Sequence, residues 1–596
     1  VGGLVVRGAA PGDSGFFLDG VRIPNAFHFL GGPSVLSPQL IRNIDYYPGN
    51  SDARYNRLIA GVVDVSSVES GKDKLSGQVD INLLNASAYI SVPITKKLRV
   101  SASGRRSYID VILPPILKRV NDGATVVTPK YYDYQSRVDF DLSANDHIWA
   151  MVFGSQDDLT FATNDPDSIQ NATLSARIAF HRIMAKWTHT FGDRGYNEVI
   201  PFLGYDINSI SIGQANVDIS VYTLGLRQNF KYDMAKWLTL RAGTDIEMAH
   251  GEFDAIIPVP KPYRNPGAPP EQFDDTNTQP INNKQWYGGG GIYVSPTFLL
   301  GERLTLTPGL RFDIQTYLED NVKIDVNPRL NARFKATDKI VLKAGAGTYS
   351  QPPRPEFANP VSGNPNLGLE RAAQFSAGFE RPIFWSSLNL SMQIYYNYRF
   401  SSVAFSDKTA TNDDGNISAV NFENSGNGYS TGMEVMLKQN VTKHLYGWVA
   451  YTLSWARQRA TDNDPYRRFR FDQRHILTVV GSYRFLRGWE TGLRFRMVTG
   501  APFTPFSGGV LDADAGLYVG QTAGIFSQSL PTFHQLDFRV ERKWRHKTWA
   551  FSAYLDIQNV YNAKNPQLTI QDYRFNQSGT IAGIPILPTF GFKATF

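Results

Sequence analysis

Apolar and polar residues alternate along much of the chain with a period of two. At the C-terminus, Phe590, Phe592 and Phe596 share one parity, while Lys593 lies on the other. The segment 304–314 alternates in the same way, with mostly large apolar residues on one face and threonine, arginine and aspartate on the other. Successive side chains of a β-strand point to opposite faces of its sheet. The pattern therefore predicts a protein built almost wholly from half-buried β-strands.

Short turns and long connections alternate between these strands. The short turns are read at Thr95–Lys97, Ser143–Asp146, Gly192–Gly195, Asp233–Lys236, Leu300–Arg303, Thr337–Lys339, Trp385–Ser387, Thr442–His444, Leu486–Trp489 and Arg545–Thr548. These ten turns on one rim imply eleven hairpins and therefore about 22 strands. Long connections such as 501–531 and 562–583 would then lie on the opposite rim.

Long strands joined in this way are typical of bacterial outer-membrane barrels, in which tilted strands cross the bilayer. Barrels of about 22 strands are usually plugged. We therefore expect an all-β fold: a transmembrane antiparallel β-barrel of about 22 strands with an N-terminal plug inside the lumen. The last strand would close against the first and leave no open edge. An array of soluble β-sandwiches would share the alternation, but its strands rarely run so long.

The composition is compatible with this architecture. The chain has 596 residues, of which 42% are hydrophobic and 13% aromatic. No stretch approaches the roughly 18 apolar residues of a spanning helix, which excludes a helical membrane protein. A barrel needs no such stretch, because only alternate residues of its strands face lipid.

Charge and reactive residues exclude several classes of function. The net charge of +6 is small for this length and spread along the chain, so no nucleic-acid partner is expected. The chain has no cysteine, and its nine histidines show no metal-binding spacing, so no metal or cofactor is expected. No GxSxG motif occurs, and the protein is predicted not to be an enzyme. An outer-membrane hydrolase is the least favoured alternative.

The first 74 residues lack the rhythm of long strands and short turns. We expect two domains, a plug formed by residues 1–74 and a barrel formed by residues 75–596. Within the first, Asp19 and Gly20 are predicted to form a hairpin turn between two short strands.

Motifs in both parts resemble those of one family, the TonB-dependent outer-membrane transporters. The matching segments are "VVRG" (Val5–Gly8), "FFLDGVRIP" (Phe16–Pro24), "IRNIDYYPG" (Ile41–Gly49), "ARYNRLIAGVVDV" (Ala53–Val65), "NPNLGLER" (Asn364–Arg371), "GYSTGMEVMLK" (Gly428–Lys438), "FDQRHIL" (Phe471–Leu477) and "LDIQNVYNAKNP" (Leu555–Pro566). Asn56 and Val62 depart from the pattern, since the family usually has glycine at both positions.

The resemblance implies a receptor in the bacterial outer membrane that takes up a scarce solute, such as a ferric siderophore, by energised rearrangement of its plug. It implies as partners a TonB-type energy transducer, outer-membrane lipid and lipopolysaccharide, and a small-molecule or ferric-chelate ligand; further partner subunits are an open alternative. The family's plug is about twice as long as residues 1–74, so coupling to TonB depends on whether the other half precedes Val1. A passive pore or a structural barrel subunit of an envelope complex is the alternative function.

Two segments of the plug, Ala9–Gly15 and Asn25–Gly32, resemble the loops that face the outer vestibule in this family. From them we expect ligand contacts at Asp13, Phe27, His28 and Phe29. Packing against the barrel wall is the alternative, which the two phenylalanines favour and which His28 leaves open.

Arginines carry the remaining predictions. Arg7 and Arg54 lie among small residues, where a buried guanidinium needs carboxylate partners. The resemblance implies ion pairs between these arginines and the barrel, either releasable or static. Arg467, Arg468 and Arg470 would form an anion patch at a loop, since guanidinium groups match phosphate and carboxylate oxygens. This patch would bind an anionic ligand or lipopolysaccharide phosphates, or would simply be solvated.

A run of glycines, Gly288–Gly291, interrupts one predicted strand. Glycines inside a barrel strand remove side chains and let a neighbouring backbone approach. We therefore expect the plug backbone to lie against this run.

Overall fold

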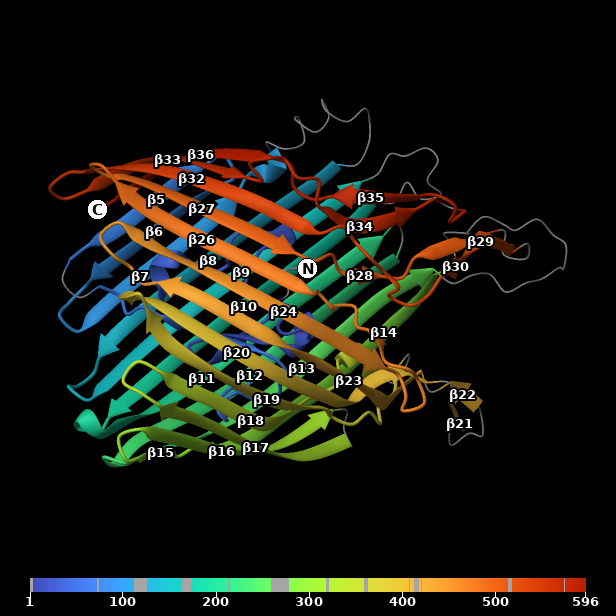
Figure 1. Cartoon of the computed structure of the whole chain (residues 1–596), viewed down its shortest axis with the longest axis horizontal. Coiled ribbons are helices and arrows are strands. Elements are labelled where there is room, and N and C mark those ends of the chain that lie inside the picture. Colours follow the sequence, from blue (N-terminus) through green and yellow to red (C-terminus); the bar gives the residue numbers. More distant parts are fainter. Residues whose placement is uncertain are drawn as a thin grey trace.

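The computed structural model describes residues 4–71, 74–111, 126–162, 173–212, 215–258, 278–317, 321–358, 363–406, 408–411, 417–419, 421–512, 517–572 and 574–596. Within them the chain is nearly all β (Figure 1). Its strands form a small inner sheet and a closed barrel that surrounds this sheet.

The barrel wall follows the order of the chain. Its strands are β5 (Ser76–Asn82), β6 (Asn85–Pro93), β7 (Leu98–Ser107), β8 (Val126–Asp141), β9 (Asp146–Ala162), β10 (Thr173–Thr190), β11 (Gly195–Ile212), β12 (Ala215–Ala235), β13 (Leu238–Pro258), β14 (Thr278–Val294), β15 (Thr297–Leu300), β16 (Leu304–Tyr317), β17 (Asn321–Lys335), β18 (Val341–Gln351), β19 (Glu370–Ile383), β20 (Trp385–Phe405), β23 (Phe422–Gln439), β24 (Leu445–Arg459), β25 (Arg467–Arg468), β26 (His475–Phe485), β27 (Trp489–Val498), β32 (Phe533–Arg545), β33 (Ala550–Gln558) and β36 (Leu587–Thr595). Because β15 continues β14, and β25 and β26 both pair with β24, the wall is a closed antiparallel barrel of 22 strands. The predicted fold class and strand number are confirmed.

The C-terminal strand closes the barrel as predicted. β36 pairs with β33 on one side and with β5, the first strand of the wall, on the other. The backbone of Phe596 exchanges two hydrogen bonds with that of Gly77. Phe590, Phe592 and Phe596 remain about half exposed on the outer face, where aromatic side chains suit a membrane interface.

The two rims differ as the sequence predicts. Each of the ten short turns joins two neighbouring wall strands, at the rim on the left of Figure 1. The long connections lie at the other rim and carry small hairpins: β21 (Thr409–Thr411) with β22 (Ile417–Ala419), β28 (Pro502–Phe503) with β31 (Gln528–Ser529), β29 (Phe506–Asp512) with β30 (Leu517–Thr522), and β34 (Pro566–Gln571) with β35 (Ser578–Ala582).

The wall has an apolar outside and a polar inside, the reverse of a soluble barrel. In β17, Ile324 and Val326 are more than half exposed, whereas Asp325, Asn327 and Arg329 on the alternate positions are buried. This arrangement places apolar side chains toward lipid and charged ones toward the lumen.

Helices are few and short. Those whose bounds lie wholly within the described residues are η1 (Pro11–Asp13), η2 (Phe29–Gly31), η3 (Pro38–Leu40), η4 (Gly192–Arg194) and α2 (Pro355–Ala358). In the part of the chain that the structure describes, no helix has the length and apolar character needed to span a membrane.

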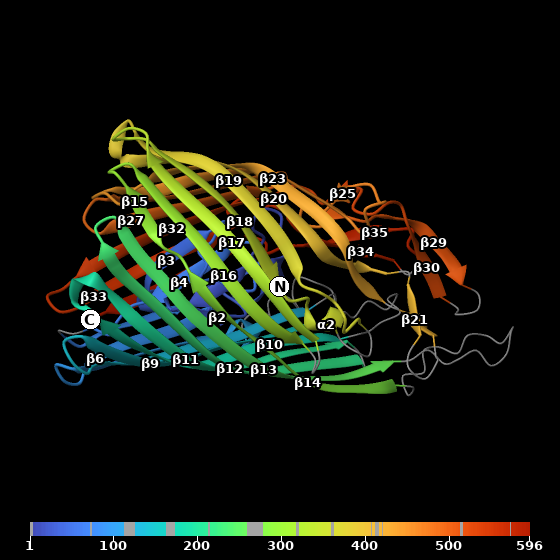
Figure 2. The same ribbon diagram turned by 90° about the horizontal axis from the view of Figure 1, so that it is seen from below.

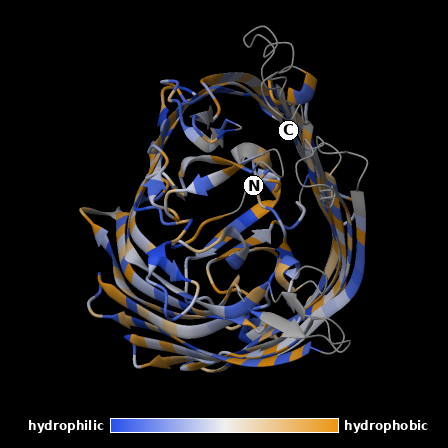
Figure 3. Ribbon diagram, turned by 90° about the vertical axis from the view of Figure 1, so that its right-hand side faces the viewer, coloured by the Kyte–Doolittle hydropathy of each residue, from blue (hydrophilic) through white to orange (hydrophobic). Residues whose placement is uncertain are grey.

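The inner sheet has four strands in the order β2 (Val21–Ile23), β1 (Gly15–Leu18), β4 (Val62–Ser67) and β3 (Ile41–Tyr47). β1 and β4 are parallel, and the other two pairs are antiparallel. Asp19 and Gly20 form the predicted hairpin turn between β1 and β2, both with positive φ, as a tight two-residue hairpin turn of the mirror-image type requires. Figure 3, seen from the rim of long connections, shows the N-terminal segments inside the ring of wall strands, and Figure 2 shows β2, β3 and β4 behind the wall.

The largest apolar core lies between the inner sheet and the wall. Its buried members from the N-terminal segment are Leu18, Val21, Ile23, Val35, Leu36 and Val65, and those from the wall are Trp149, Met151, Phe153, Phe180, Met184, Ile200 and Phe202. The wall residues belong to β9, β10 and β11. We call this core the apolar contact.

Candidate functional site

The inner segment, residues 4–71, meets the rest of the wall mainly through polar side chains, beside a small apolar cluster of Ile59, Tyr349 and Ala372. We call the contacts of Arg7 and residues 49–57 with strands β12 to β23 the polar contact. A buried acid, Asp245 of β13, lies at its centre. Arg57 donates to its carboxylate at 2.8 Å, and Arg311 of β16 donates at 2.6 Å. Asn56, one of the departures from the family pattern, donates through Nδ2 at 2.5 Å.

Other wall arginines donate to the backbone of the same segment and to the side chain of Asn56. Arg329 donates to the carbonyl oxygens of Ser51 at 3.2 Å and Tyr55 at 3.1 Å, and its guanidinium lies over the ring of Tyr349. Arg227 donates to Asn56 Oδ1 at 2.8 Å. The wall therefore supplies donors to carbonyl groups that the loop leaves without a partner in a helix or sheet.

Arg7 forms an ion pair with the wall. Its guanidinium donates to both carboxylate oxygens of Glu434 in β23, at 3.0 and 2.6 Å, and to Gln393 at 3.1 Å. It also lies over the ring of Tyr395, 4.3 Å from the centroid. The Arg7 side chain is 1% exposed and that of Glu434 is 23% exposed, so water reaches one end of the pair.

Arg54 does not pair with the barrel, which corrects the sequence-based expectation. Its guanidinium lies 3.5 Å from the carboxylate of Asp64 in β4 and donates to the hydroxyl of Tyr55 at 2.5 Å. Wall arginines such as Arg329 already face this loop, and the carboxylate that Arg54 approaches belongs to the inner sheet. Its ion pair lies within the sheet.

The glycine run serves a different purpose from the expected one. A Cβ at Gly291 would lie 2.4 Å from both Arg311 Nη2 and Asp313 Oδ1, so this glycine makes room for the Arg311–Asp313 ion pair of the neighbouring strand. Arg311 in turn reaches Asp245. At Gly288, Gly289 and Gly290 a Cβ would lie nearest to backbone oxygens of β13 and β16, so the run lies against neighbouring wall strands and not against the backbone of the inner segment.

His28 is enclosed by the wall. Its ring is fully buried, with Nδ1 3.0 Å from Asp157 and Nε2 3.1 Å from Asp133. The ring stacks on Tyr131 with the centroids 4.1 Å apart. Burial disfavours the imidazolium, but hydrogen bonds to Asp133 and Asp157 outweigh this effect, so the pKa of His28 is raised above its ordinary value.

The other three residues predicted to contact the ligand differ in exposure. Phe27 is 42% exposed and meets Phe16 edge-on. Phe29 is partly buried, and its backbone N–H donates to Asp157 at 3.2 Å. Asp13 is buried and accepts hydrogen bonds from Ala10 N at 3.0 Å and Gln351 Nε2 at 3.1 Å. Phe27 is thus the most open of the four.

The three arginines of the predicted anion patch lie near the rim of long connections. Arg468 donates to the buried carboxylate of Asp472 at 3.2 Å and to Ser529 at 2.9 Å. Arg467 and Arg470 are exposed. Two guanidinium groups therefore face solvent beside a third whose charge Asp472 offsets.

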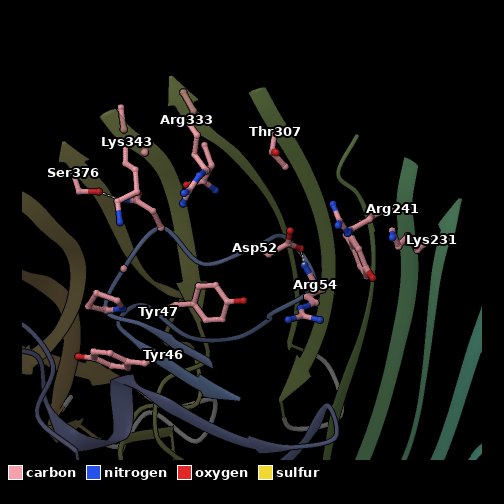
Figure 4. A pocket seen from close by; sticks show the side chains of 18 of the residues that line it. Tyr46, Tyr47, Asp52, Arg54, Lys231, Arg241, Thr307, Arg333, Lys343 and Ser376 are labelled. Carbon is pink, nitrogen blue, oxygen red and sulfur yellow. Dashed lines mark hydrogen bonds between the residues drawn. The ribbon is translucent and has the colours of Figure 1, made fainter. Parts of the chain in front are cut away.

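A cavity of about 550 Å³ lies beside β3 and the loop that follows it (Figure 4). The wall residues around it lie near the strand ends that join the short turns. Side chains labelled around it come from β3, from the loop that follows β3 and from the wall: Tyr46, Tyr47, Asp52, Arg54, Lys231, Arg241, Thr307, Arg333, Lys343 and Ser376. The inner segment therefore leaves polar, charged space in the lumen. Sequence reasoning missed this cavity, because its lining comes from strands far apart in the chain.

A closed 22-stranded barrel with apolar outer and polar inner faces, holding a sheet in its lumen, defines a plugged outer-membrane β-barrel. The model of the TonB dependent receptor-like β-barrel family matches residues 115–560. The chain belongs to this family, as the motifs indicated, and is a multi-pass barrel of the bacterial outer membrane. No curated protein sequence matches it.

Solved structures of receptors and transporters share the fold. The outer membrane transporter YddB from Escherichia coli is 10% identical with a TM-score of 0.72, over 100% of this chain and 92% of that one. The FrpB iron transporter from Neisseria meningitidis is 16% identical with a TM-score of 0.71, over 99% and 92%. The ferripyoverdine receptor of the outer membrane of Pseudomonas aeruginosa, bound to ferripyoverdine, is 12% identical with a TM-score of 0.73, over 100% and 81%.

Proposed function

We propose that this receptor takes up a scarce solute through an energised rearrangement of residues 1–74, which act as the plug of a barrel formed by residues 75–596. The observation that carries the proposal is the polar contact. Its arginines and carboxylates are held by hydrogen bonds that water can replace, so this side can open without exposing a large apolar surface. A TonB-type energy transducer is the proposed source of force.

A ferric chelate such as a ferric siderophore is the proposed solute. FrpB is an iron transporter, and the Pseudomonas receptor binds ferripyoverdine; these relatives give the class of ligand to test first. Such chelates often carry anionic oxygens, which suit guanidinium groups.

The proposed ligand contacts follow exposure. Phe27 offers an aromatic face, and Arg467 and Arg470 offer cations to the ligand or to lipopolysaccharide phosphates. Asp13, His28 and Phe29 instead hold the loops 9–15 and 25–32 in position, since their polar groups already have partners in the protein.

A disulfide across the polar contact tests the mechanism. The chain has no cysteine, and a Cβ at Gly309 of β16 would lie 3.1 Å from that of Ala53, a few tenths of an ångström below the range of about 3.5–4.5 Å found in disulfides. Receptor carrying Ala53→Cys and Gly309→Cys should lose uptake of a radiolabelled ferric chelate when oxidised and regain it with reductant. Each single cysteine is the matched control.

The same cells separate the alternatives. Active uptake requires TonB, so deletion of the transducer should abolish transport by the wild-type receptor. Uptake that persists without TonB, and in the oxidised double cysteine variant, would point to a passive pore and overturn the proposal.

A further inference from the structure

His28 has an arrangement of partners that one form of histidine satisfies better than the other. Its Nδ1 lies 3.0 Å from both oxygens of Asp157, and its Nε2 lies 3.1 Å from Asp133 Oδ2. Ionised carboxylates only accept hydrogen bonds, and a neutral imidazole has a single N–H. Both contacts are satisfied together only when the three groups hold one proton more than a neutral imidazole and two carboxylates.

One further group faces the ring. Arg105 of β7 donates through Nε to Asp133 at 2.7 Å, and its Nη2 lies 3.4 Å from His28 Nε2. If His28 were neutral with its proton on Nδ1, Nε2 would accept a hydrogen bond from Arg105 across this longer distance. A lone pair of the Asp133 carboxylate would then face the lone pair of Nε2, which is repulsive. The shorter contact to Asp133 favours the imidazolium.

The charges around the ring balance only with the proton in place. Asp133 and Tyr131 on β8, Asp157 on β9 and Arg105 on β7 are the titratable and charged groups that face it. Protonated His28 and Arg105 offset the two carboxylates. Loss of the proton leaves one net negative charge in a buried site, which is costly.

The ring also joins the inner segment to the wall. His28 lies in the loop between β2 and η3, and the backbone of the same loop accepts from Gln135 at Val35 and from Arg105 at Ser34. His28 N bonds to Pro33 O within the loop at 3.1 Å. The backbone N–H of Phe29 donates to Asp157 at 3.2 Å. His28 is the only ionisable side chain among residues 25–36, and it joins this loop to two carboxylates of the wall.

We propose that His28 is a proton-binding site that anchors the apex loop, residues 25–36, to strands β8 and β9, and that release of the proton loosens this anchor. The anchor stands on the geometry alone, whereas its use in gating uptake rests on the proposed function. An acidic medium outside the cell would keep the apex loop anchored to β8 and β9, and an alkaline medium would ease release of the loop from these strands.

The sign of the pH dependence follows from linkage. The pKa of His28 is raised in the anchored state, so the proton stabilises that state fully below the ordinary histidine value of about 6.5. Between that value and the raised pKa, the ratio of loosened to anchored loop should increase about tenfold per pH unit. Above the raised pKa it should level off.

A nitroxide on the loop measures this ratio. Phe27→Cys is a unique labelling site, because the chain has no cysteine and Phe27 is exposed. With His28 intact, the electron paramagnetic resonance spectrum of the labelled Phe27→Cys receptor should show an immobile label at pH 5.5. A mobile component should grow above pH 6.5. His28→Gln should remove the pH dependence, because an amide does not titrate. His534→Gln, at an exposed histidine far from the loop in sequence, is the matched control and should leave it unchanged.

¹⁵N NMR of receptor that carries ¹⁵N-labelled histidine and no nitroxide measures the protonation state of His28 independently. The His28 signal is identified by its loss in His28→Gln. An imidazolium signal at pH 6.5 is expected. Asp157→Asn should lower the pH at which this signal titrates, which keeps the test valid if His28→Gln fails to fold. A neutral His28 at pH 6.5, or label mobility that is flat with pH in the wild-type background, would overturn the proposal. Neither measurement depends on transport.

Discussion

The two sides of the inner segment meet the wall by different physics. Toward β9, β10 and β11 the contact is mainly apolar, with side chains such as Phe153 and Met184 almost wholly buried, and His28 adds a hydrogen-bonded contact to β9. Toward β12 to β23 ion pairs and hydrogen bonds around Asp245, Arg329 and Glu434 predominate, and the apolar part is limited to a small cluster around Ile59. Exposing apolar surface costs about 25 cal/mol per Å², with nothing in water to replace it. A polar contact regains hydrogen bonds from water as it opens.

This difference predicts which side of the inner segment should detach from the wall first. A force on the inner segment should open the polar contact while the apolar contact still holds. Hydrogen exchange of the inner segment, followed by mass spectrometry, reports the free energy of opening on each side separately.

The largest effect is expected from the apolar contact. Phe153→Ala would leave a cavity beside Phe180, whose ring it meets at 5.1 Å, and should cost about 3 kcal/mol of anchorage. Exchange in β1 and β2 should then quicken about a hundredfold. Ile183→Ala is the matched control: Ile183 is 56% exposed on the outer face of β10, so exchange in the inner sheet should not change. Equal effects of both variants would show that the barrel, and not the contact, had been weakened.

Breaking the Arg7–Glu434 pair should cost less. Arg7→Met leaves a partly buried carboxylate without its partner, at about 2 kcal/mol, and should speed exchange of residues 4–14. Arg7→Met with Glu434→Met should recover most of that loss, because a pair of apolar side chains has no unpaired charge.

Arg333→Met is the control for this pair, since Arg333 also lies in the lumen but is 55% exposed. Its effect should stay below about 1 kcal/mol. A double variant no better than Arg7→Met would mean that the polar contact depends on the specific ion pair, and the contrast between the two sides would weaken.

The wall was predictable from the sequence because its information is local. Alternation sets which residues face lipid, short turns set the register of hairpins, and Asp19–Gly20 marks the turn in the inner sheet. Closure of β36 against β5 follows from the need to leave no edge.

The site was less predictable, because its contacts join distant positions. Arg7 and Glu434 are 427 residues apart, and His28 lies 105 and 129 residues from its two carboxylates. Parity shows that Asp245 or Arg311 faces the lumen, but no periodic signal sets how the inner segment docks on the wall. Arg7 and Arg54 both lie among small residues, so the sequence does not distinguish them. Only Arg7 forms an ion pair with the wall.

The smallest effect separates these two arginines. Arg54 is 37% exposed and 3.5 Å from Asp64 within the inner sheet, so Arg54→Ala should cost about 0.5 kcal/mol. The loss should appear as slightly faster exchange in β3 and β4, with residues 4–14 unaffected. Arg7→Met should give the opposite distribution. If Arg54→Ala instead loosened residues 4–14 as strongly as Arg7→Met, the inner sheet and the polar contact would open as one unit, and the order of opening would have to be set by the apolar contact alone.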